Sequence, residues 1–309
     1  MLSKELQARR EELYGLMGRL PGRNNPIHCK KVSEKDCGSY ILECLVLTIE
    51  TTEGEPHTEP IPAYFARPHG EGVFPAVLFN HSHGGMYDVG KDELLSPASY
   101  MYKPSYAEAL TAQGYAVLCI DQWCFGERGG RMEENTYKEM LWKGEYMWGR
   151  MVYDNLRGLD YLCSRPDVDA SRIATLGMSM GSTMAWWTAA LDERIKVCVD
   201  ICCLTDFDAL IMRDNLNYHS IYYYIPNLLL HFSSSQINSL IAPRAHLATI
   251  GIYDGLTPLE GVDRIEREVG EVYGKFDAAD KFSVLRYPNG HRESVEMRAD
   301  IMAFIKKYL

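Results

Sequence analysis

The sequence predicts an α/β protein with a mostly parallel central sheet and helices on both faces. Short apolar segments typical of buried strands alternate along the chain with amphipathic segments typical of helices. Glycine and proline residues bound many of these segments, as turns require. The chain has 309 residues, of which 46% are hydrophobic and 24% charged, so it can bury a large core.

The first twenty residues have the pattern of an amphipathic helix. Its apolar positions recur at helical spacing and are Leu6, Leu13, Leu16, Met17 and Leu20. Pro21 ends this helix, and a loop is expected to follow. We therefore assign residues 1–34 to an N-terminal helix and lead-in, and residues 35–309 to the main domain.

The main domain alternates strands and helices. Strands are predicted at residues 40–51, 61–66, 75–80, 115–121, 172–176, 197–203, 245–253 and 282–287. Helices are predicted at residues 105–113, 147–163 and 182–191 and from about residue 293 to the end. Two longer insertions, at about 122–146 and 204–243, follow strands. Because open α/β sheets bind ligands at the carboxyl ends of their strands, we expect these insertions to form the walls of a substrate pocket.

Charge and composition exclude several classes of partner. The net charge is −10 and no run of Lys or Arg is longer than a pair, so neither nucleic acid nor an anionic membrane is expected to bind. No apolar stretch is long enough for a spanning helix, and the N-terminus lacks the apolar core of a signal peptide. The nine cysteines show no metal-ligand spacing, which favours a reduced, cytoplasmic protein. No cofactor is expected, and a homo-oligomer is compatible with the sequence.

The most informative motif is Gly177-Met178-Ser179-Met180-Gly181. It follows a strand-like run and precedes a helix-like run, as in a Gly-x-Ser-x-Gly nucleophile elbow. Such a turn forces the central serine into a strained backbone conformation and leaves its hydroxyl protruding. Ser179 is therefore the predicted nucleophile.

A serine nucleophile needs a base, and the base needs a carboxylate. His291 follows the last predicted strand and is the predicted base. Asp254 follows the preceding strand and is the predicted acid, with Asp200 and Asp206 as alternative acids. A turn-forming role for the Asp254-Gly255 pair is the structural alternative.

The negative charge of a tetrahedral intermediate needs backbone donors. One is expected to be the amide of Met180 at the start of the elbow helix. The other is expected from the loop His81-Ser82-His83-Gly84-Gly85, where two glycines allow close approach to a ligand. His81 and His83 could instead be a metal pair, but no carboxylate or thiolate lies at metal-ligand spacing, so no metal is predicted. Trp123, Tyr222 and Tyr223 are the predicted substrate contacts, with core or lid packing as the alternative for these aromatic residues.

The chain resembles the α/β-hydrolases, in the branch that joins dienelactone-hydrolase-like proteins with acetyl xylan esterases. The resemblance covers about residues 35–309. It rests on Pro75–Leu78, His81–Gly85, Gly114–Leu118, Asp121 with Phe125–Gly130, the Gly177–Gly181 elbow, Ile241–Arg244 and Asn289–His291. The chain order Ser179, Asp254, His291 is the order of this fold.

The resemblance implies which chemistry to expect. Members usually read His-Gly-His-Gly-Gly at the oxyanion loop; here Ser82 replaces the first glycine, and the second donor maps to the His83 amide. Dienelactone hydrolases use cysteine, whereas Ser179 indicates ester hydrolysis. We expect a serine carboxylic-ester hydrolase acting on short-chain esters or acetylated sugars. The alternatives are a serine peptidase-like hydrolase, which needs a gating domain that 309 residues do not accommodate, and a non-catalytic binding protein of the same fold.

Overall fold

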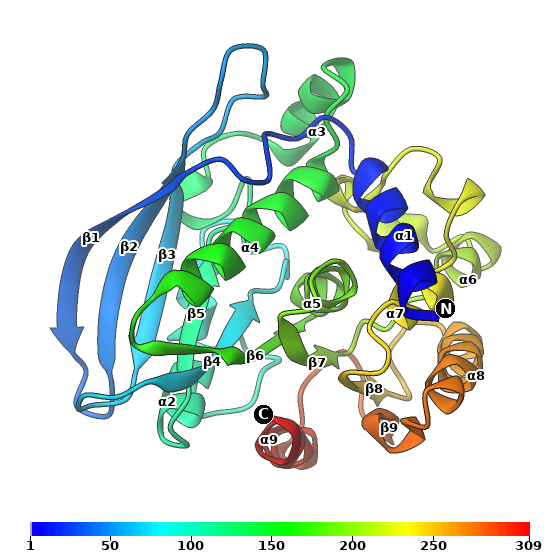
Figure 1. The fold of residues 1–309 in the computed structure, drawn as a ribbon. Coiled ribbons are helices and arrows are strands. Elements are labelled where there is room, and N and C mark those ends of the chain that lie inside the picture. Colours follow the sequence, from blue (N-terminus) through cyan, green and yellow to red (C-terminus); the bar gives the residue numbers. More distant parts are fainter. Residues whose placement is uncertain (1) are drawn as a thin grey trace.

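The computed structural model describes residues 2–309, which form a nine-stranded sheet covered by helices (Figure 1). Its strands, in chain order, are β1 (Ile27–Asp36), β2 (Ile41–Ile49), β3 (Ile61–Arg67), β4 (Phe74–Asn80), β5 (Ala116–Ile120), β6 (Val168–Met178), β7 (Ile195–Ile201), β8 (Ala245–Gly251) and β9 (Phe282–Tyr287). The spatial order is β1-β2-β3-β5-β4-β6-β7-β8-β9. From β5 to β9 neighbouring strands are parallel, whereas β1, β2 and β3 pair antiparallel along one edge. The predicted mostly parallel sheet is confirmed.

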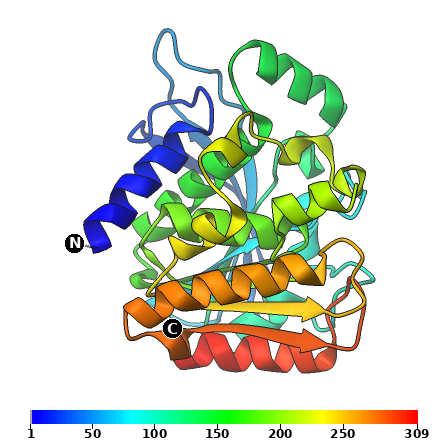
Figure 2. The same cartoon turned by 90° about the vertical axis from the view of Figure 1, so that its right-hand side faces the viewer.

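Helices cover both faces of the sheet, as predicted. The α-helices are α1 (Leu2–Gly15), α2 (Tyr106–Thr111), α3 (Glu133–Trp142), α4 (Met147–Ser164), α5 (Met180–Leu191), α6 (Phe207–Met212), α7 (Ser234–Ser239), α8 (Leu259–Lys275) and α9 (Val295–Tyr308). Helices α4 and α5 pack on one face, and α2 and α9 on the other (Figures 1 and 2). Alternate residues of β4 divide accordingly: Ala76 and Leu78 lie in the first core, and Val77 and Phe79 in the second.

The structure differs from the predicted elements at the N-terminal end. The loop expected before residue 40 contains strand β1, which pairs with β2 at the edge of the sheet. The predicted helix over residues 1–20 ends at Gly15. Gly18 has φ of +81°, and a Cβ on it would lie 3.0 Å from the carbonyl oxygen of Gly144, so the chain turns there to pair with Glu145.

Helix α1 is attached to elements that come much later in the sequence. It packs against α5, and Leu13 is fully buried. The buried Arg10 guanidinium donates hydrogen bonds to the carbonyl oxygens of Ala190 (3.1 Å) and Leu240 (2.8 Å). These carbonyls lie at the C-terminal ends of α5 and α7, where the helix supplies no donor, so Arg10 helps to satisfy buried acceptors.

Both insertions lie at the carboxyl ends of the strands that precede them. The first contains α3, and the second contains α6, α7 and the short 3₁₀-helices η3 (Leu216–Tyr218) and η4 (Ile221–Tyr223). Helix α3 packs against η4, so the two insertions meet. Across residues 2–309, no helix has the length and apolar character needed to cross a membrane.

Candidate active site

Ser179 lies at the tip of the turn between β6 and α5. Its backbone has φ of +59° and ψ of −119°, a conformation that L-residues rarely adopt. The flanking glycines are required by contact: a Cβ on Gly181 would lie 2.0 Å from the carbonyl oxygen of Asn80, and one on Gly177 would lie 2.4 Å from that of Gly181. The elbow therefore packs directly against the end of β4, which leaves the serine at the carboxyl edge of the sheet.

Asp254 and His291 lie side by side in the turns after β8 and β9. The Nδ1 atom of His291 is 2.7 Å from Oδ2 of Asp254, whose side chain is fully buried. Because a carboxylate only accepts, Nδ1 donates and Nε2 keeps its lone pair. The other Asp254 oxygen accepts from the amide of Leu256 at 2.9 Å, which fixes the carboxylate plane.

The two alternative acids are engaged elsewhere. Asp200 lies 2.7 Å from Nε2 of His246 in a fully buried pair beneath the sheet edge. Asp206 accepts from the amide of Ala209 at the start of α6 and pairs with Arg264 at 3.2 Å. Asp254 is thus the acid that the fold brings to His291.

Ser179 and His291 line the same cavity, which has a volume of about 370 Å³. Besides Ser179 and Tyr100, its lining comes from the oxyanion loop, from the turns that carry His291 and Leu256, and from the second insertion. The last group comprises Asn217, Tyr218, His219, Ser220 and Tyr222. These five residues of the second insertion form one wall of the cavity.

The two predicted oxyanion donors come from the start of α5 and from the loop after β4. The carbonyl of Ser179 accepts from the amide of Thr183 at 3.1 Å, so Met180 begins the helix and its amide has no acceptor within it. His83, Gly84 and Gly85 line the same cavity as Ser179. Gly84 has φ of +53°, and a Cβ on it would lie 2.4 Å from the hydroxyl of Tyr100, so glycine is required there.

His81 is a structural residue of this loop. Its Nδ1 lies 2.9 Å from the carbonyl oxygen of Ser82, and its Nε2 accepts from the amide of Gln122 at 3.1 Å. Both ring nitrogens are therefore engaged with backbone, and His81 has no lone pair to offer a metal ion. Burial lowers the pKa of His81, in keeping with a neutral ring.

Ser82, the residue that departs from the family pattern, anchors the loop to a buried carboxyl. Its amide donates to Glu93 at 2.9 Å, and its hydroxyl donates to the other oxygen of the same carboxyl and contacts the hydroxyl of Tyr100. Glu93 is almost completely buried, and burial raises its pKa to about 7. A glycine at this position could keep the amide hydrogen bond to Glu93 but would lack the one from the hydroxyl.

A second buried carboxylate, Glu133 of α3, lies beside His83 of the loop. Gly85 donates to Nδ1 of His83 at 3.0 Å, so Nε2 carries the hydrogen; it lies 3.4 Å from Glu133 without forming a hydrogen bond. Glu133 accepts from the hydroxyls of Tyr87 (3.2 Å) and Ser220. It thereby connects the first insertion to the second and to Tyr87. Sequence reasoning missed Glu133 because the Glu133-Glu134 pair has the appearance of a solvated helix start.

The three aromatic residues predicted to contact the substrate lie in different parts of the structure. Tyr222 lines the cavity, and its ring stacks on His83 with centroids 5.5 Å apart. Tyr223 lies behind the wall and lines a second pocket instead. Trp123, expected at the pocket, is buried between Arg128 and Arg150, whose guanidinium carbons lie 4.4 and 5.2 Å from the ring.

The conformation of the loop that carries Trp123 explains why this residue does not line the Ser179 cavity. The carboxylate of Asp121 accepts from the amides of Lys91 (2.7 Å) and Glu127 (3.0 Å), and Arg128 donates to the carbonyl oxygen of Asp121 at 3.1 Å. These hydrogen bonds hold the chain after β5 in a closed loop, and in this loop Trp123 lies outside the lining of the Ser179 cavity.

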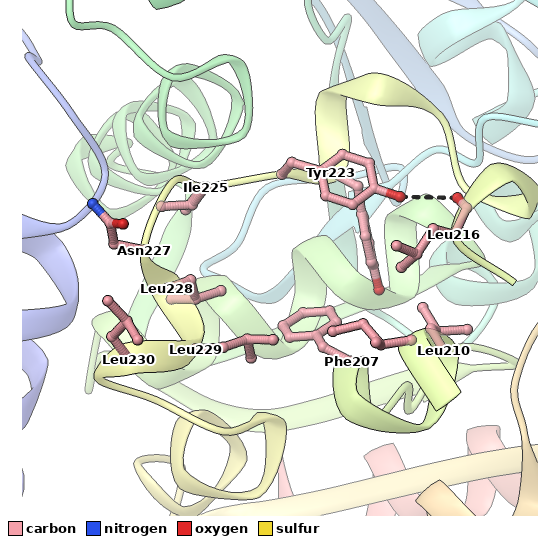
Figure 3. Close-up of a pocket in the computed structure, with 11 residues that line it drawn as sticks. Phe207, Leu210, Leu216, Tyr223, Ile225, Asn227, Leu228, Leu229 and Leu230 are labelled. Atoms are coloured by element: carbon pink, nitrogen blue, oxygen red, sulfur yellow. Dashed lines mark hydrogen bonds between the residues drawn. The ribbon is translucent and has the colours of Figure 1, made fainter. Parts of the chain in front are cut away.

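The second pocket is apolar and has a volume of about 330 Å³ (Figure 3). Its lining comes entirely from the second insertion, with Phe207, Leu210 and Tyr223 among the members. Tyr224 donates to the carbonyl oxygen of Leu216 at 2.9 Å across this pocket (dashed line in Figure 3). Tyr223 also stacks on His219 and meets Tyr222 edge-on, and both of these line the Ser179 cavity. The Tyr223 ring therefore separates the two pockets.

Comparisons with known proteins agree with this fold and identify the family. Residues 27–234 match the acetyl xylan esterase (AXE1) family. A Bacillus subtilis (strain 168) protein named "Putative hydrolase YtaP" is 50% identical over 302 residues, which cover 97% of this chain and 99% of that protein. Both matches include the elbow; Asp254 and His291 lie beyond the family match.

Solved esterases share the fold at low sequence identity. The acetyl xylan esterase from Paenibacillus sp. R4 superposes with a TM-score of 0.60 at 20% identity, over 100% of this chain and 93% of that one. The glucuronoyl esterase from Solibacter usitatus superposes with a TM-score of 0.65 at 16% identity, over 96% and 91%. The predicted α/β-hydrolase fold is confirmed. The chain belongs to the acetyl xylan esterase (AXE1) family and is a carboxylic-ester hydrolase of the α/β-hydrolase fold.

Proposed function

We propose that Ser179, Asp254 and His291 form the catalytic triad of an esterase that removes acetyl and other short acyl groups from hydroxylated alcohols such as sugars. The observation that carries this proposal is the 2.7 Å hydrogen bond between His291 and Asp254 at a cavity that also contains the strained Ser179. The amides of Met180 and His83 are the proposed oxyanion donors. Of the three aromatic residues predicted from the sequence to contact the substrate, Tyr222 is the one that we propose as a substrate contact.

The proposed reaction has two stages. Nε2 of His291 takes the proton from Ser179 as its Oγ attacks the ester carbonyl, and the two amides stabilise the oxyanion. Collapse of the intermediate breaks the bond to the alcohol oxygen, which receives the proton from His291, and leaves an acyl-Ser179. A water molecule then repeats the sequence: it gives a proton to His291, attacks the acyl carbon, and releases the carboxylic acid and the serine.

Support for a sugar ester comes from the relatives. The family is described as acetyl xylan esterase, and the solved neighbours include acetyl xylan and glucuronoyl esterases. The cavity agrees in polarity, since its rim carries Asn217, Tyr218 and His219. We also propose a cytoplasmic location, because all nine cysteines are free thiols.

The test is labelling and replacement of Ser179. A fluorophosphonate should modify Ser179 stoichiometrically, and Ser179→Ala should abolish hydrolysis of p-nitrophenyl acetate while the circular dichroism spectrum is retained. Ser182→Ala, three residues further along the same helix, is the matched control and should still be labelled and active. Stoichiometric labelling of another serine, or turnover by Ser179→Ala, contradicts the proposal. Faster cleavage of aminoacyl-nitroanilides than of acetate esters would instead favour the peptidase alternative.

A further inference from the structure

His219 is a polar residue of the cavity wall to which the proposed mechanism gives no part. It lies between η3 and η4 in the second insertion and lines the cavity that holds Ser179 and His291. Its Nε2 is 3.1 Å from the carbonyl oxygen of Leu256. A carbonyl only accepts, so Nε2 carries the hydrogen, and in the neutral ring Nδ1 carries the lone pair.

The lone pair of Nδ1 is available. Within residues 2–309 no donor reaches this atom, and it is not among the polar atoms buried without a partner, so it is accessible at the cavity. Burial lowers the pKa of His219, and the nearby His291 lowers it further, which keeps the ring neutral. Two other hydroxyl groups of the cavity are engaged: Ser220 donates to Glu133, and Tyr100 contacts Ser82.

The ring is also held in one orientation. It stacks on Tyr223 with centroids 4.9 Å apart and an interplanar angle of 14°. Tyr223 is itself buried, and its hydroxyl lies 3.4 Å from that of Thr183 at the base of the elbow helix. A fixed acceptor loses little conformational entropy on binding a donor, so its hydrogen bond can discriminate between substrates.

The position of His219 indicates whether it faces the acyl group or the alcohol of the bound ester. The leaving alcohol must lie on the side of His291, because His291 gives it a proton. His219 and His291 line the same cavity, and the hydrogen-bond partner of His219, Leu256, follows Asp254 by two residues. In the proposed mechanism the acyl carbonyl oxygen lies toward Met180 and His83 instead.

We propose that His219 is the specificity-determining residue for the alcohol: Nδ1 accepts a hydrogen bond from a hydroxyl adjacent to the ester oxygen. The site would then prefer partly acetylated polyols and sugars over esters of simple alcohols. This inference rests on the proposed esterase function. Since a binding pocket that pairs with a substrate hydroxyl rejects an analogue that lacks it, the preference should be measurable with very small substrates.

Two acetates that differ only by a hydroxyl in place of a methyl group provide the test: 2-hydroxyethyl acetate and n-propyl acetate. The wild-type enzyme should have a kcat/KM at least about tenfold higher for 2-hydroxyethyl acetate, the effect of one hydrogen bond. His219→Phe retains a ring that can stack on Tyr223 but removes both nitrogens, and its ratio should fall to about one. His219→Gln, which can donate to Leu256 and present an oxygen, should restore part of the preference.

The ratio of the two kcat/KM values is the readout. If a variant has a smaller folded fraction, both kcat/KM values fall by the same factor and their ratio does not change. His231→Phe makes the same change elsewhere in the same insertion and should keep the wild-type ratio. A wild-type ratio near one, or an unchanged ratio in His219→Phe, overturns the inference. Failure of the proposed function is distinguishable, since it appears as hydrolysis of both acetates by Ser179→Ala.

Discussion

In the proposed triad, Asp254 determines which nitrogen of His291 is free to act as the base. The carboxylate accepts from Nδ1, so the lone pair stays on Nε2. An amide at the same position could donate to Nδ1 instead, which would place the hydrogen on Nε2 and remove the base. The shape of the site would be retained while its chemistry would be lost.

We therefore expect Asp254→Asn to lower kcat by about three to four orders of magnitude with little change in KM. Steady-state kinetics with p-nitrophenyl acetate measures both constants. Asp200→Asn is the control: it disrupts the buried pair with His246 and should lower the unfolding temperature, while turnover per labelled active site is retained. Near-normal kcat in Asp254→Asn together with an inactive Asp200→Asn would place the acid after β7.

At the scale of secondary-structure elements, burial decides what the sequence could predict. Strands β4 and β5 are apolar runs that are nearly or wholly buried, and both were predicted. Strand β1 was missed because most of its residues are exposed, so no face of it has an apolar pattern. Helix α8 was also missed. It buries an apolar face that includes Val262 and Ile265, but charged residues occupy so many of its other positions that the apolar spacing is not evident in the sequence.

The same distinction applies to the site. That Ser179, Asp254 and His291 come together could be predicted because each follows an apolar strand, and parallel strands bring their ends together. Glu133 and His219 come from insertions with no regular period, so only the folded chain shows that they face the oxyanion loop and the cavity. Trp123 was misplaced because the hydrogen bonds of Asp121 that close its loop are tertiary contacts.

The wall between the two pockets sets an expectation for acyl length. The Tyr223 ring closes the Ser179 cavity off from the apolar pocket, so acetyl to butyryl esters should be hydrolysed far better than octanoyl esters. Tyr223→Ala should open the cavity into the apolar pocket of about 330 Å³ and raise kcat/KM for the octanoyl ester at least about tenfold relative to acetyl. A p-nitrophenyl ester series measures this profile.

Tyr224→Ala is the matched control for that experiment. Tyr224 also lines the apolar pocket, but its hydroxyl binds Leu216 and its ring does not stack on His219. The preferred acyl length should therefore stay short in this variant. A wild-type maximum at eight carbons or beyond would show that the two pockets already communicate.

At the scale of the whole molecule, the raised pKa of Glu93 links stability to pH. A glutamate in the unfolded chain titrates near 4.5, whereas Glu93 in the folded protein titrates near 7 because it is buried. Between these values the folded state holds a proton that the unfolded state has released. The free energy of unfolding should therefore fall as pH rises through this window, by about 3 kcal/mol in total.

Glu93→Gln isolates this contribution because the amide imitates the protonated carboxyl beside Ser82. The variant should gain stability relative to wild type as pH rises from about 4.5 to 7, with a constant difference on either side of that range. Urea unfolding at several pH values measures it. A difference that does not change between pH 4 and 8 would mean that Glu93 titrates alike in both states.

The attachment of α1 through Arg10 has a consequence for the order in which the chain acquires its structure. The helix is synthesised well before its two acceptors, which lie 180 and 230 residues later. At about 5–20 residues per second, the ribosome needs roughly 10–50 s to deliver the second of them. Until α5 has been synthesised, Leu13 on the apolar side of α1 lacks the helix against which α1 packs in the folded protein. The nascent chain must therefore carry an incompletely covered helix for more than half of the synthesis of these 309 residues, and we expect chaperone binding or premature association to begin at that helix.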